Sequence, residues 1–466
     1  MNRQIRVITL VFLGMFALLV LNVSYIVLFQ GKDLASNPAN TRAAETARTT
    51  ERGQITSADG IVLATSRKVG NHYERQYPQG AMAAQLIGYS SYRYHNSGLE
   101  KTYDDYLLGT DSAGFITDLT RKFKRPEKRG GSLTLTLDTR LQKVAEAGLA
   151  GQKGAVVALD PKTGAVLAMA SSPSFDLNEV DSSWTVITAD ANAPLVNRAT
   201  EGAYAPGSTF KIITAGAALE EGIYRPTDTF DDTGSLEVMG TTVKNLNDRV
   251  FGRVTFKEAL EFSVNTVFAQ VGLKLGANRL FQYASKFGFN TEIPFDIPVK
   301  ISRVKRPSAM DEVDVAWTAI GQAKTVTNPF EMALATAAIA NDGVSMNPYV
   351  VSLIKDAKGM VVRTAGTSER EQAISAPAAA TLTDMMVGVT QEGFGSVVNI
   401  PGIRVASKTG TAETGIPGQT HGWFVAFAPA DNPQIAIAVI VENGGTGSGS
   451  AGPIVRALLD EALKSP

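Results

Sequence analysis

The sequence predicts a mixed α/β (α+β) protein, in which one mainly antiparallel sheet of five strands is flanked by helices. Two apolar runs, 155–160 and 165–170, are joined by Pro161-Lys162-Thr163-Gly164, which is typical of a tight hairpin. Three further strands and a closing helix are expected near the C-terminus, at residues 403–411, 423–428 and 435–441 and from Pro453 to Leu463. Helices predicted between these strands would cover the sheet and bury its apolar faces.

An almost uninterrupted apolar run spans residues 7–29, long enough as a helix to cross the hydrocarbon layer of a membrane. Arg3 and Arg6 precede it, and positive charge before a span favours a cytoplasmic N-terminus. A cleaved signal peptide is the alternative, but the run is longer than the apolar part of a usual signal peptide, and no convincing cleavage site follows it. We therefore expect an uncleaved anchor within residues 1–30, with the remaining chain outside the cytoplasmic membrane.

The other 436 of the 466 residues exceed the usual size of a single domain. We expect an extended membrane-proximal module over 31–137 and a second, larger domain over 138–466. Asp59-Gly60 predicts a hairpin in the module, and a short helix is expected to end at Gly109. Asp138 is a suitable N-cap for the helix that would open the second domain. The basic residues 121–129 are expected to form a solvated loop.

Composition excludes several classes of function. The net charge is −1 and no basic block occurs, so a nucleic-acid partner is not expected. The absence of cysteine removes disulfides, thiol catalysis and thiolate metal sites. The three histidines are scattered and show no metal-binding spacing, so we do not expect a metal site. A cofactor is not expected either. If the chain is an enzyme, lysine is the expected base.

The central motif is Ser208-Thr209-Phe210-Lys211, which follows the turn residues Pro206 and Gly207 and opens an apolar helix. Residues three apart on a helix share a face, so Lys211 can reach the Ser208 hydroxyl. Burial at a helix N-terminus disfavours an ammonium, which helps a lysine act as a neutral base for a serine nucleophile. The alternative is an N-capping serine, because Ser-x-x-Lys is a loose pattern that recurs at Ser302 and Ser352.

Two other short motifs lie at positions suited to a site. Ser263-Val264-Asn265 interrupts two predicted helices, the first of which begins with the capping-box pattern Thr255 and Glu258. Lys408-Thr409-Gly410-Thr411 falls at the end of a predicted strand. Lys-Thr-Gly also occurs at 162–164, where a simple turn explains it.

The order of these three motifs resembles the signature set of serine acyltransferases that bind penicillin. The wider likeness is to class B penicillin-binding proteins, in particular the short actinobacterial penicillin-binding protein A type. It covers the chain after the anchor and is carried by four more segments, the hairpin from Arg52, Gly98-Leu99-Glu100, Ala319-Ile320-Gly321-Gln322 and 421–426. The resemblance implies a penicillin-binding transpeptidase fold and a monofunctional peptidoglycan D,D-transpeptidase.

The same resemblance implies roles for individual residues. Ser208 would be the nucleophile and Lys211 its base, while Ser263 and Lys408 would relay a proton to the leaving nitrogen. Substrate-binding roles would fall to Asn265, Thr409, Gly410 and Thr411. Two departures from the family pattern border the cleft: Ser407 stands where glycine is common, and residues 391–396 replace a Gly-Thr pair.

The implied partners are peptidoglycan stem peptides on a lipid-linked precursor or nascent glycan, β-lactam antibiotics and the cytoplasmic membrane. A separate membrane glycosyltransferase is also expected, because the segment before the acyltransferase unit is too short for a second catalytic domain. Two alternatives stay open from the sequence. One is a D,D-carboxypeptidase or β-lactamase that uses water as acceptor, and the other is a penicillin-binding sensor or scaffold without turnover.

Overall fold

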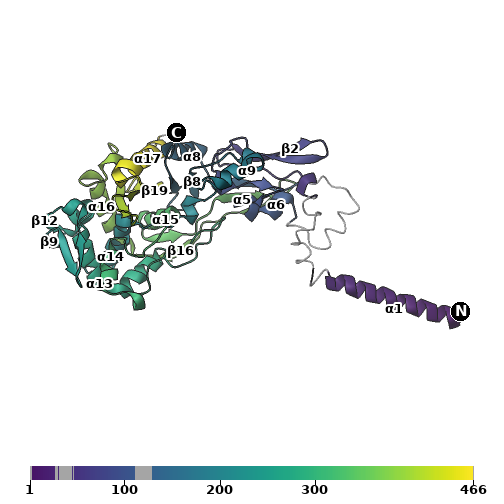
Figure 1. Cartoon of the computed structure of the whole chain (residues 1–466), viewed down its shortest axis with the longest axis horizontal. Coiled ribbons are helices and arrows are strands. Elements are labelled where there is room, and N and C mark those ends of the chain that lie inside the picture. The colour runs from purple at the N-terminus through teal and green to yellow at the C-terminus, as the bar shows by residue number, and fades with distance from the viewer. Residues whose placement is uncertain (1–2, 27–29, 31–44, 46, 111–128, 465–466) are drawn as a thin grey trace.

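The computed structural model describes residues 3–26, 30, 45, 47–110 and 129–464. Helix α1 (Arg3–Tyr25) is the one described helix long and apolar enough to cross a membrane, and none of its residues is buried against the rest of the chain. It stands apart from the folded body in Figure 1. The expected basic loop at 121–129 lies outside the described residues except for Arg129, as does most of the segment between α1 and residue 47.

A five-stranded antiparallel sheet forms the centre of the larger part of the molecule, in the order β17-β18-β19-β7-β8. Its strands are β7 (Gly154–Leu159), β8 (Val166–Ser172), β17 (Ala406–Glu413), β18 (Thr420–Ala428) and β19 (Ile435–Val441). The expected five-stranded sheet is therefore confirmed. The first C-terminal strand starts three residues later than expected, because Ile403 pairs only with Ile400 in an isolated bridge. Strand β17 is an edge strand, so one side of it faces the rest of the domain without a strand partner.

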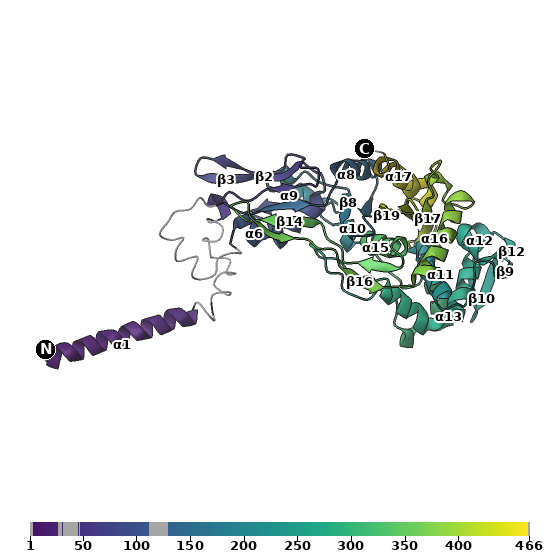
Figure 2. The same ribbon diagram turned by 180° about the vertical axis from the view of Figure 1, so that it is seen from behind.

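Helices cover both faces of this sheet, because side chains on successive strand residues point to opposite faces. One face packs on α8 (Thr139–Gly148) and α17 (Gly447–Ala462), with Val156, Phe424 and Ile454 in a common core. The other face packs on α15 (Pro329–Ala340) and the helices behind it, with Val157 and Phe427 in a second core. Figures 1 and 2 show α8 and α17 together on one side of the sheet and α15 on the other.

The helix boundaries follow local chemistry at most ends. The Asp138 side chain accepts a hydrogen bond from the Arg140 amide and caps α8, as expected. Thr255 and Glu258 form the predicted capping box at the start of α12 (Phe256–Glu261). The expected start of the last helix at Pro453 is wrong, because α17 begins at Gly447 and contains Pro453. A Cβ on Gly447 would lie 1.9 Å from the Trp423 carbonyl oxygen, so tertiary packing holds this Gly- and Ser-rich turn in the helix.

A second sheet of six strands forms the N-terminal module, in the order β15-β14-β6-β1-β2-β3. Its strands are β1 (Ile55–Thr56), β2 (Val62–Val69), β3 (His72–Gln76), β6 (Ser132–Leu135), β14 (Val351–Lys355) and β15 (Val361–Thr364). The hairpin at Asp59-Gly60 is confirmed by the antiparallel pairing of β1 with β2. Strands β14 and β15 come from much later in the chain, and Figure 2 shows β14 reaching into this module.

The remaining elements complete the two parts. In and beside the module lie α4 (Ala84–Ile87), β4 (Ser90–Ser91), β5 (His95–Asn96), α5 (Gly98–Thr102), α6 (Asp104–Leu108), η2 (Leu177–Glu179) and α9 (Val180–Ala189). The helix expected to end at Gly109 is thus divided into α5 and α6 around Tyr103, and Gly109 caps α6 with a φ of 68°. The larger part of the molecule adds α10 (Arg198–Glu201), η5 (Pro307–Ala309), α14 (Glu312–Ala319), β13 (Val344–Met346), β16 (Glu369–Gln372), α16 (Ala376–Gln391) and η6 (Ser396–Val398).

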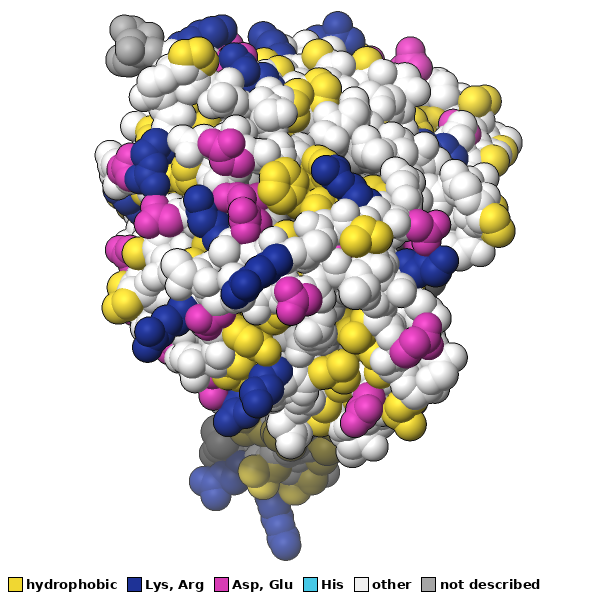
Figure 3. All heavy atoms as spheres, turned by 90° about the vertical axis from the view of Figure 1, so that its left-hand side faces the viewer, with side chains coloured by type: hydrophobic (Ala, Val, Ile, Leu, Met, Phe, Trp, Pro, Cys, Tyr) yellow, Lys and Arg dark blue, Asp and Glu magenta, His cyan; other side chains and the backbone are white. Residues whose placement is uncertain are grey.

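A lobe of short strands and helices lies at the end of the molecule farthest from α1 (Figure 1). It contains β9 (Thr229–Asp232) paired with β12 (Gly252–Thr255), β10 (Ser235–Val238) paired with β11 (Thr241–Lys244), η4 (Leu246–Asp248) and α13 (Asn265–Lys286). Figure 3 looks onto this end, where Lys and Arg side chains are spread among Asp and Glu side chains. No broad basic surface therefore covers the described residues on the face that Figure 3 shows.

Candidate active site

The turn that carries Ser208 is a 3-10 helix, η3 (Gly207–Phe210), which leads into the buried helix α11 (Lys211–Glu220). Gly207 has a φ of +53°, and a Cβ there would lie 2.7 Å from the Thr411 carbonyl oxygen. The Gly207 amide donates to the Gly321 carbonyl at 2.9 Å. A glycine is therefore required at 207 for the turn to lie directly against β17. The sequence places Ser208 at a helix start, and the structure adds that this start abuts the edge strand of the sheet.

Ser263 lies between α12 and α13 with a φ of 55°, an uncommon conformation for a residue with a side chain. Its backbone carbonyl thereby reaches the Lys211 amine, which donates to this oxygen at 2.7 Å. The Lys211 Nζ also lies 2.6 Å from Asn265 Oδ1 and 3.2 Å from Ser263 Oγ. The interruption that the sequence predicts between the two helices is thus the feature that brings Ser263 and Asn265 to Lys211.

Burial and the nearby Lys408 lower the pKa of Lys211 well below its ordinary value. A neutral amine has two N–H donors and one lone pair. The Ser263 carbonyl and the Asn265 side-chain oxygen are acceptors and take the two donors. The lone pair is then left to accept a proton from a hydroxyl. This arrangement suits Lys211 to general-base chemistry.

Lys408 is fully buried on β17, and its Nζ donates to Ser263 Oγ at 2.9 Å and to the Thr409 carbonyl at 2.9 Å. Burial lowers the pKa of Lys408 to about 7. Ser263 Oγ therefore lies between the two lysine amines, in hydrogen-bonding distance of both. A hydroxyl in this position can pass a proton from one amine to the other, because it both donates and accepts.

Ser208 lines a cleft of about 850 Å³ together with Ser263, Asn265, Thr409 and Thr411. Within the described part of the chain, the Ser208 hydroxyl makes no hydrogen bond, so it is free to meet a ligand. Nucleophile and base contacts are often loose without substrate and tighten when it binds. The expected site residues thus open onto one cleft or onto the buried lysine pair behind it, with one exception.

The exception is Gly410, which is not among the described residues that line the cleft. A Cβ at this position would lie 2.9 Å from Thr209 Cγ2 and 2.9 Å from Trp423 Cβ. Gly410 therefore allows β17 to pack closely against the η3 turn. Its neighbours Thr409 and Thr411 point into the cleft because side chains alternate along a strand.

Both departures from the family pattern are explained by a single contact region. The Ser407 hydroxyl is buried and hydrogen-bonds the Thr390 hydroxyl at 2.8 Å. A Cβ on Gly395 would lie 2.4 Å from Ser407 Oγ, so this glycine leaves the room that the serine needs. The loop at 391–396 and the serine before Lys408 therefore fit each other, and both fix β17 on α16.

Other cleft residues were not found by sequence reasoning. Lys244 and Trp317 line the cleft, and only the Gly321-Gln322 segment of the family resemblance pointed to this wall. Phe394, which also lines the cleft, belongs to the segment 391–396 that the sequence placed at its border. The remaining Ser-x-x-Lys matches are structural: Ser302 Oγ bonds Thr327 Oγ1 in the core, and Ser352 Oγ donates to the Thr134 carbonyl within the sheet. Among the described residues, no group of three or more His, Asp or Glu could hold a metal ion.

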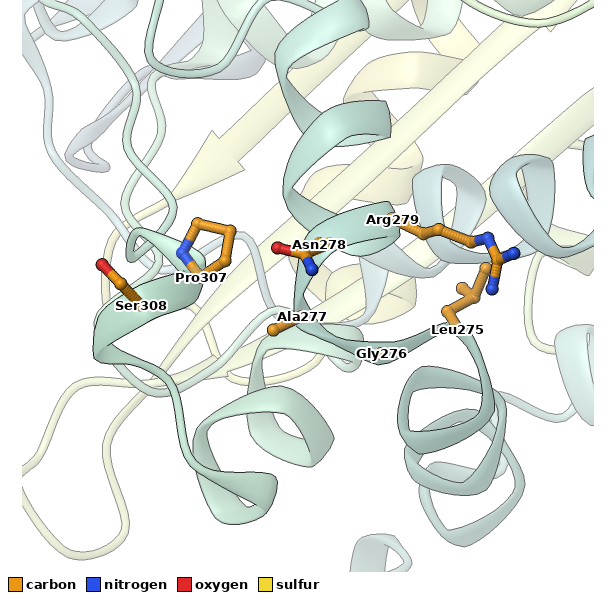
Figure 4. A pocket seen from close by; sticks show the side chains of 7 residues that line it. All are labelled: Leu275, Gly276, Ala277, Asn278, Arg279, Pro307 and Ser308. Atoms are coloured by element: carbon orange, nitrogen blue, oxygen red, sulfur yellow. The ribbon is translucent and has the colours of Figure 1, made fainter.

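A second depression, of about 640 Å³, lies where α13 is broken at Gly276, whose φ is 77°. Figure 4 shows its lining side chains, with Leu275 and Arg279 to the right of Gly276 and Pro307 and Ser308 to its left. Its seven lining residues include none of those that line the Ser208 cleft. The serine and lysine chemistry therefore belongs to the Ser208 cleft.

Comparison with known proteins agrees with this geometry. The sequence matches the penicillin-binding protein transpeptidase domain over residues 154–460 and the penicillin-binding protein A dimerisation domain over residues 52–133. The peptidoglycan D,D-transpeptidase PbpA of Mycolicibacterium smegmatis is 35% identical over 494 aligned residues, covering 100% of this chain and 99% of that protein.

Solved structures are similar over most of the chain. The D,D-transpeptidase domain of a peptidoglycan glycosyltransferase from Eggerthella lenta has a TM-score of 0.83 at 38% identity, covering 89% of this chain and 99% of that chain. Penicillin-binding protein A from M. tuberculosis, as an imipenem acyl-enzyme complex, has a TM-score of 0.84 at 35% identity, covering 90% and 100%. The chain therefore belongs to the class B penicillin-binding proteins, the monofunctional peptidoglycan D,D-transpeptidases.

Proposed function

We propose that Ser208 is the nucleophile with which this transpeptidase forms its acyl-enzyme, and that Lys211 is the base that takes the serine proton. The observation that carries the proposal is the continuous chain of contacts from Lys211 through Ser263 to Lys408, behind the cleft that Ser208 lines. A buried lysine with a lowered pKa supplies the lone pair that such a step needs.

In the acylation step, Ser208 Oγ attacks the carbonyl carbon of the D-Ala-D-Ala bond of a donor stem peptide, and Lys211 accepts the hydroxyl proton. The C–N bond then breaks, and the leaving D-alanine nitrogen receives a proton passed through Ser263 and Lys408. In the second step, an amine of a neighbouring stem peptide attacks the ester carbonyl. The amide bond of the cross-link forms as the ester C–O bond to Ser208 breaks, and the proton from the amine returns to the Ser208 oxygen.

We assign the substrate contacts from the family resemblance and the geometry of the cleft. The backbone N–H groups of Ser208 and Thr411 would stabilise the oxyanion, and the close approach of Gly207 to Thr411 supports this pairing. Asn265 would hydrogen-bond the substrate amide, and the Thr409 and Thr411 hydroxyls would hold the terminal carboxylate. Gly410 belongs to the same substrate-binding strand and keeps it close to the nucleophile turn.

The protein would be held in the bacterial cell membrane by a single-pass anchor within residues 1–30, with the catalytic domain on the extracellular side. The module at 31–137 would support the domain at 138–466, which returns β14 and β15 to the module. Stem peptides on a lipid-linked precursor or nascent glycan would be the substrates, and β-lactams would acylate Ser208. A membrane glycosyltransferase would supply the glycan, and no cofactor takes part.

Labelling by a fluorescent penicillin tests the nucleophile. Native protein should label covalently, whereas Ser208→Ala should keep its thermal unfolding temperature and lose the label. Persistent labelling of the variant would refute the role of Ser208. Incubation with a stem peptide, with and without an amine acceptor, then distinguishes the enzymes: cross-linked product supports a transpeptidase, hydrolysis alone a carboxypeptidase, and labelling without turnover a sensor or scaffold.

A further inference from the structure

Asp232, at the end of β9, lies at the centre of a buried hydrogen-bond cluster that the serine and lysine chemistry does not include. Its side chain is almost fully buried, with a relative exposure of 3%. The carboxylate accepts from Thr266 Oγ1 at 2.5 Å, from the Phe251 amide at 2.7 Å and from the Gly234 amide at 3.1 Å. Asn245 Nδ2 donates to both of its oxygens at 2.9 Å. Burial alone would raise the pKa of Asp232, but these donors outweigh it and lower the pKa.

The cluster joins two segments that meet at Asn265. On the α13 side, the N-terminal Val264 provides no side-chain cap, and the Asn245 side-chain oxygen instead accepts from the Thr266 amide at 3.2 Å. On the cleft side, Asn265 Nδ2 donates to the Lys244 carbonyl at 2.8 Å. Asn245 Nδ2 also donates to the Arg249 carbonyl at 3.0 Å.

These bonds determine which way the Asn265 amide faces. One of the two N–H groups of its nitrogen donates to the Lys244 carbonyl, so its oxygen must face Lys211 and the second N–H is left for a substrate. A shift of the segment from Lys244 to Phe251 would move that carbonyl and release the amide. Asp232 holds both ends of this segment, through Asn245 at one end and the Phe251 amide at the other.

We propose that Asp232 is a positioning residue for Asn265, and that it sets the preference of the site for acyl donors that carry an amide beside the scissile bond. The proposal rests on the role assigned to Asn265 under the proposed function. Asp232 itself does not line the cleft among the described residues, so it acts through Asn245, Thr266 and the Lys244 carbonyl.

The test compares acylation of the full-length, detergent-solubilised protein by two β-lactams. Benzylpenicillin carries an acylamide side chain, and 6-aminopenicillanic acid lacks it. Asp232→Asn places an NH2 group among donors, so it should lower the second-order acylation rate for benzylpenicillin by about tenfold, the effect of losing one hydrogen bond. The rate for 6-aminopenicillanic acid should change much less. Asn265→Ala should lower both rates, because it also removes an acceptor of the Lys211 amine, but it should shift the ratio of the two rates in the same direction. The double variant should be no worse than Asn265→Ala alone.

Asp296→Asn is the matched control, because the Asp296 carboxylate is also largely buried and accepts from the Val350 and Val351 amides at 2.6 and 3.0 Å. It should lower the unfolding temperature without altering the ratio of the two acylation rates. If Asp232→Asn does not fold, Thr266→Val removes one bond to Asp232 at similar volume and should change the same ratio in the same direction.

Three results would overturn the proposal, and they are distinguishable. A shifted ratio in Asn265→Ala with an unchanged ratio in the Asp232 or Thr266 variant would refute the positioning role alone. An unchanged ratio in Asn265→Ala would remove the assigned role of Asn265, and the positioning role with it. If the fold losses in acylation rate of the two single variants multiply in the double variant, Asp232 acts independently of Asn265. This result would also refute the positioning role.

Discussion

Glu331 should make the stability of this protein fall as pH rises through the neutral range. It lies in the first turn of α15 and is fully buried, and neither carboxylate oxygen has a hydrogen-bond partner among the described residues. Gly288 fits beside it only because it has no side chain, since a Cβ there would lie 2.0 Å from Glu331 Oε1. Burial raises the pKa of Glu331 to about 8, and the positive charge of Arg370 offsets only part of this rise.

The sign and size follow from linkage. A carboxyl whose pKa is higher in the folded than in the unfolded protein holds its proton more tightly when folded. Its contribution is fully present below the unfolded pKa and is lost as pH rises toward the folded pKa. With an unfolded pKa near 4.5 and a folded pKa of about 8, the loss between pH 5 and pH 8 is about 3 kcal/mol. Glu331→Gln removes this titration. Between pH 5 and pH 8, the free energy of unfolding of the variant should therefore rise by that amount relative to that of the native protein.

The assay is thermal unfolding of both proteins at matched pH values from 5 to 8 and constant ionic strength. The unfolding temperature of the variant should rise above that of the native protein by several degrees more at pH 8 than at pH 5. Comparing the two proteins cancels the titration of every other group. Parallel curves would refute the reasoning, because they would mean that Glu331 is ionised in the folded protein.

Three further predictions concern the site and its supports. Lys408 should lose its charge near pH 7, so the penicillin acylation rate should fall above that pH, and Lys408→Arg should remove this alkaline decline at a lower overall rate. An unchanged decline in stopped-flow profiles of that variant would contradict the assignment. Gly447→Ala should destabilise the protein by about 2 kcal/mol in thermal unfolding, because the added Cβ would overlap the Trp423 carbonyl oxygen. Gly449→Ala, whose Cβ would meet only Thr446 Oγ1 at 3.1 Å, should be neutral or stabilising. Ser407→Ala should leave the Thr390 hydroxyl unpaired and cost about 1 to 3 kcal/mol in denaturant unfolding, and an unchanged midpoint would show that this bond contributes nothing.

The parts of the fold that sequence analysis predicted correctly are those set by local chemistry. The β7–β8 hairpin follows from two apolar runs around a Pro and Gly turn, and the α12 start follows from Thr255 and Glu258. The start of α17 was missed because Gly and Ser have weak helical preference, and only the contact of Gly447 with Trp423 explains the extra turn.

Long-range strand pairing and the burial of polar groups could not be predicted from the sequence. Ser352 in β14 donates a hydrogen bond to the Thr134 carbonyl, 218 residues away, and no local pattern indicated that β14 joins the six-stranded N-terminal sheet. In the sequence, Asp232 looks like an ordinary acid near a turn. Its hydrogen-bond partners come from several separate segments, so no local pattern indicates them. Glu331 looks like a favourable acid in the first turn of a helix, and only the packing shows that it is buried.

The return of β14 and β15 into the N-terminal sheet gives the protein three covalent connections between this six-stranded sheet and the larger part of the molecule instead of one. The first passes from β6 through Thr136 to α8, the second enters β14 by way of Val350, and the third leads from β15 back to β16. A single linker would permit swivelling, whereas three crossings resist both bending and twisting. A displacement imposed on the six-stranded sheet would therefore be carried to the larger part of the molecule, and truncation after residue 137 would remove strands that the remaining chain needs as partners.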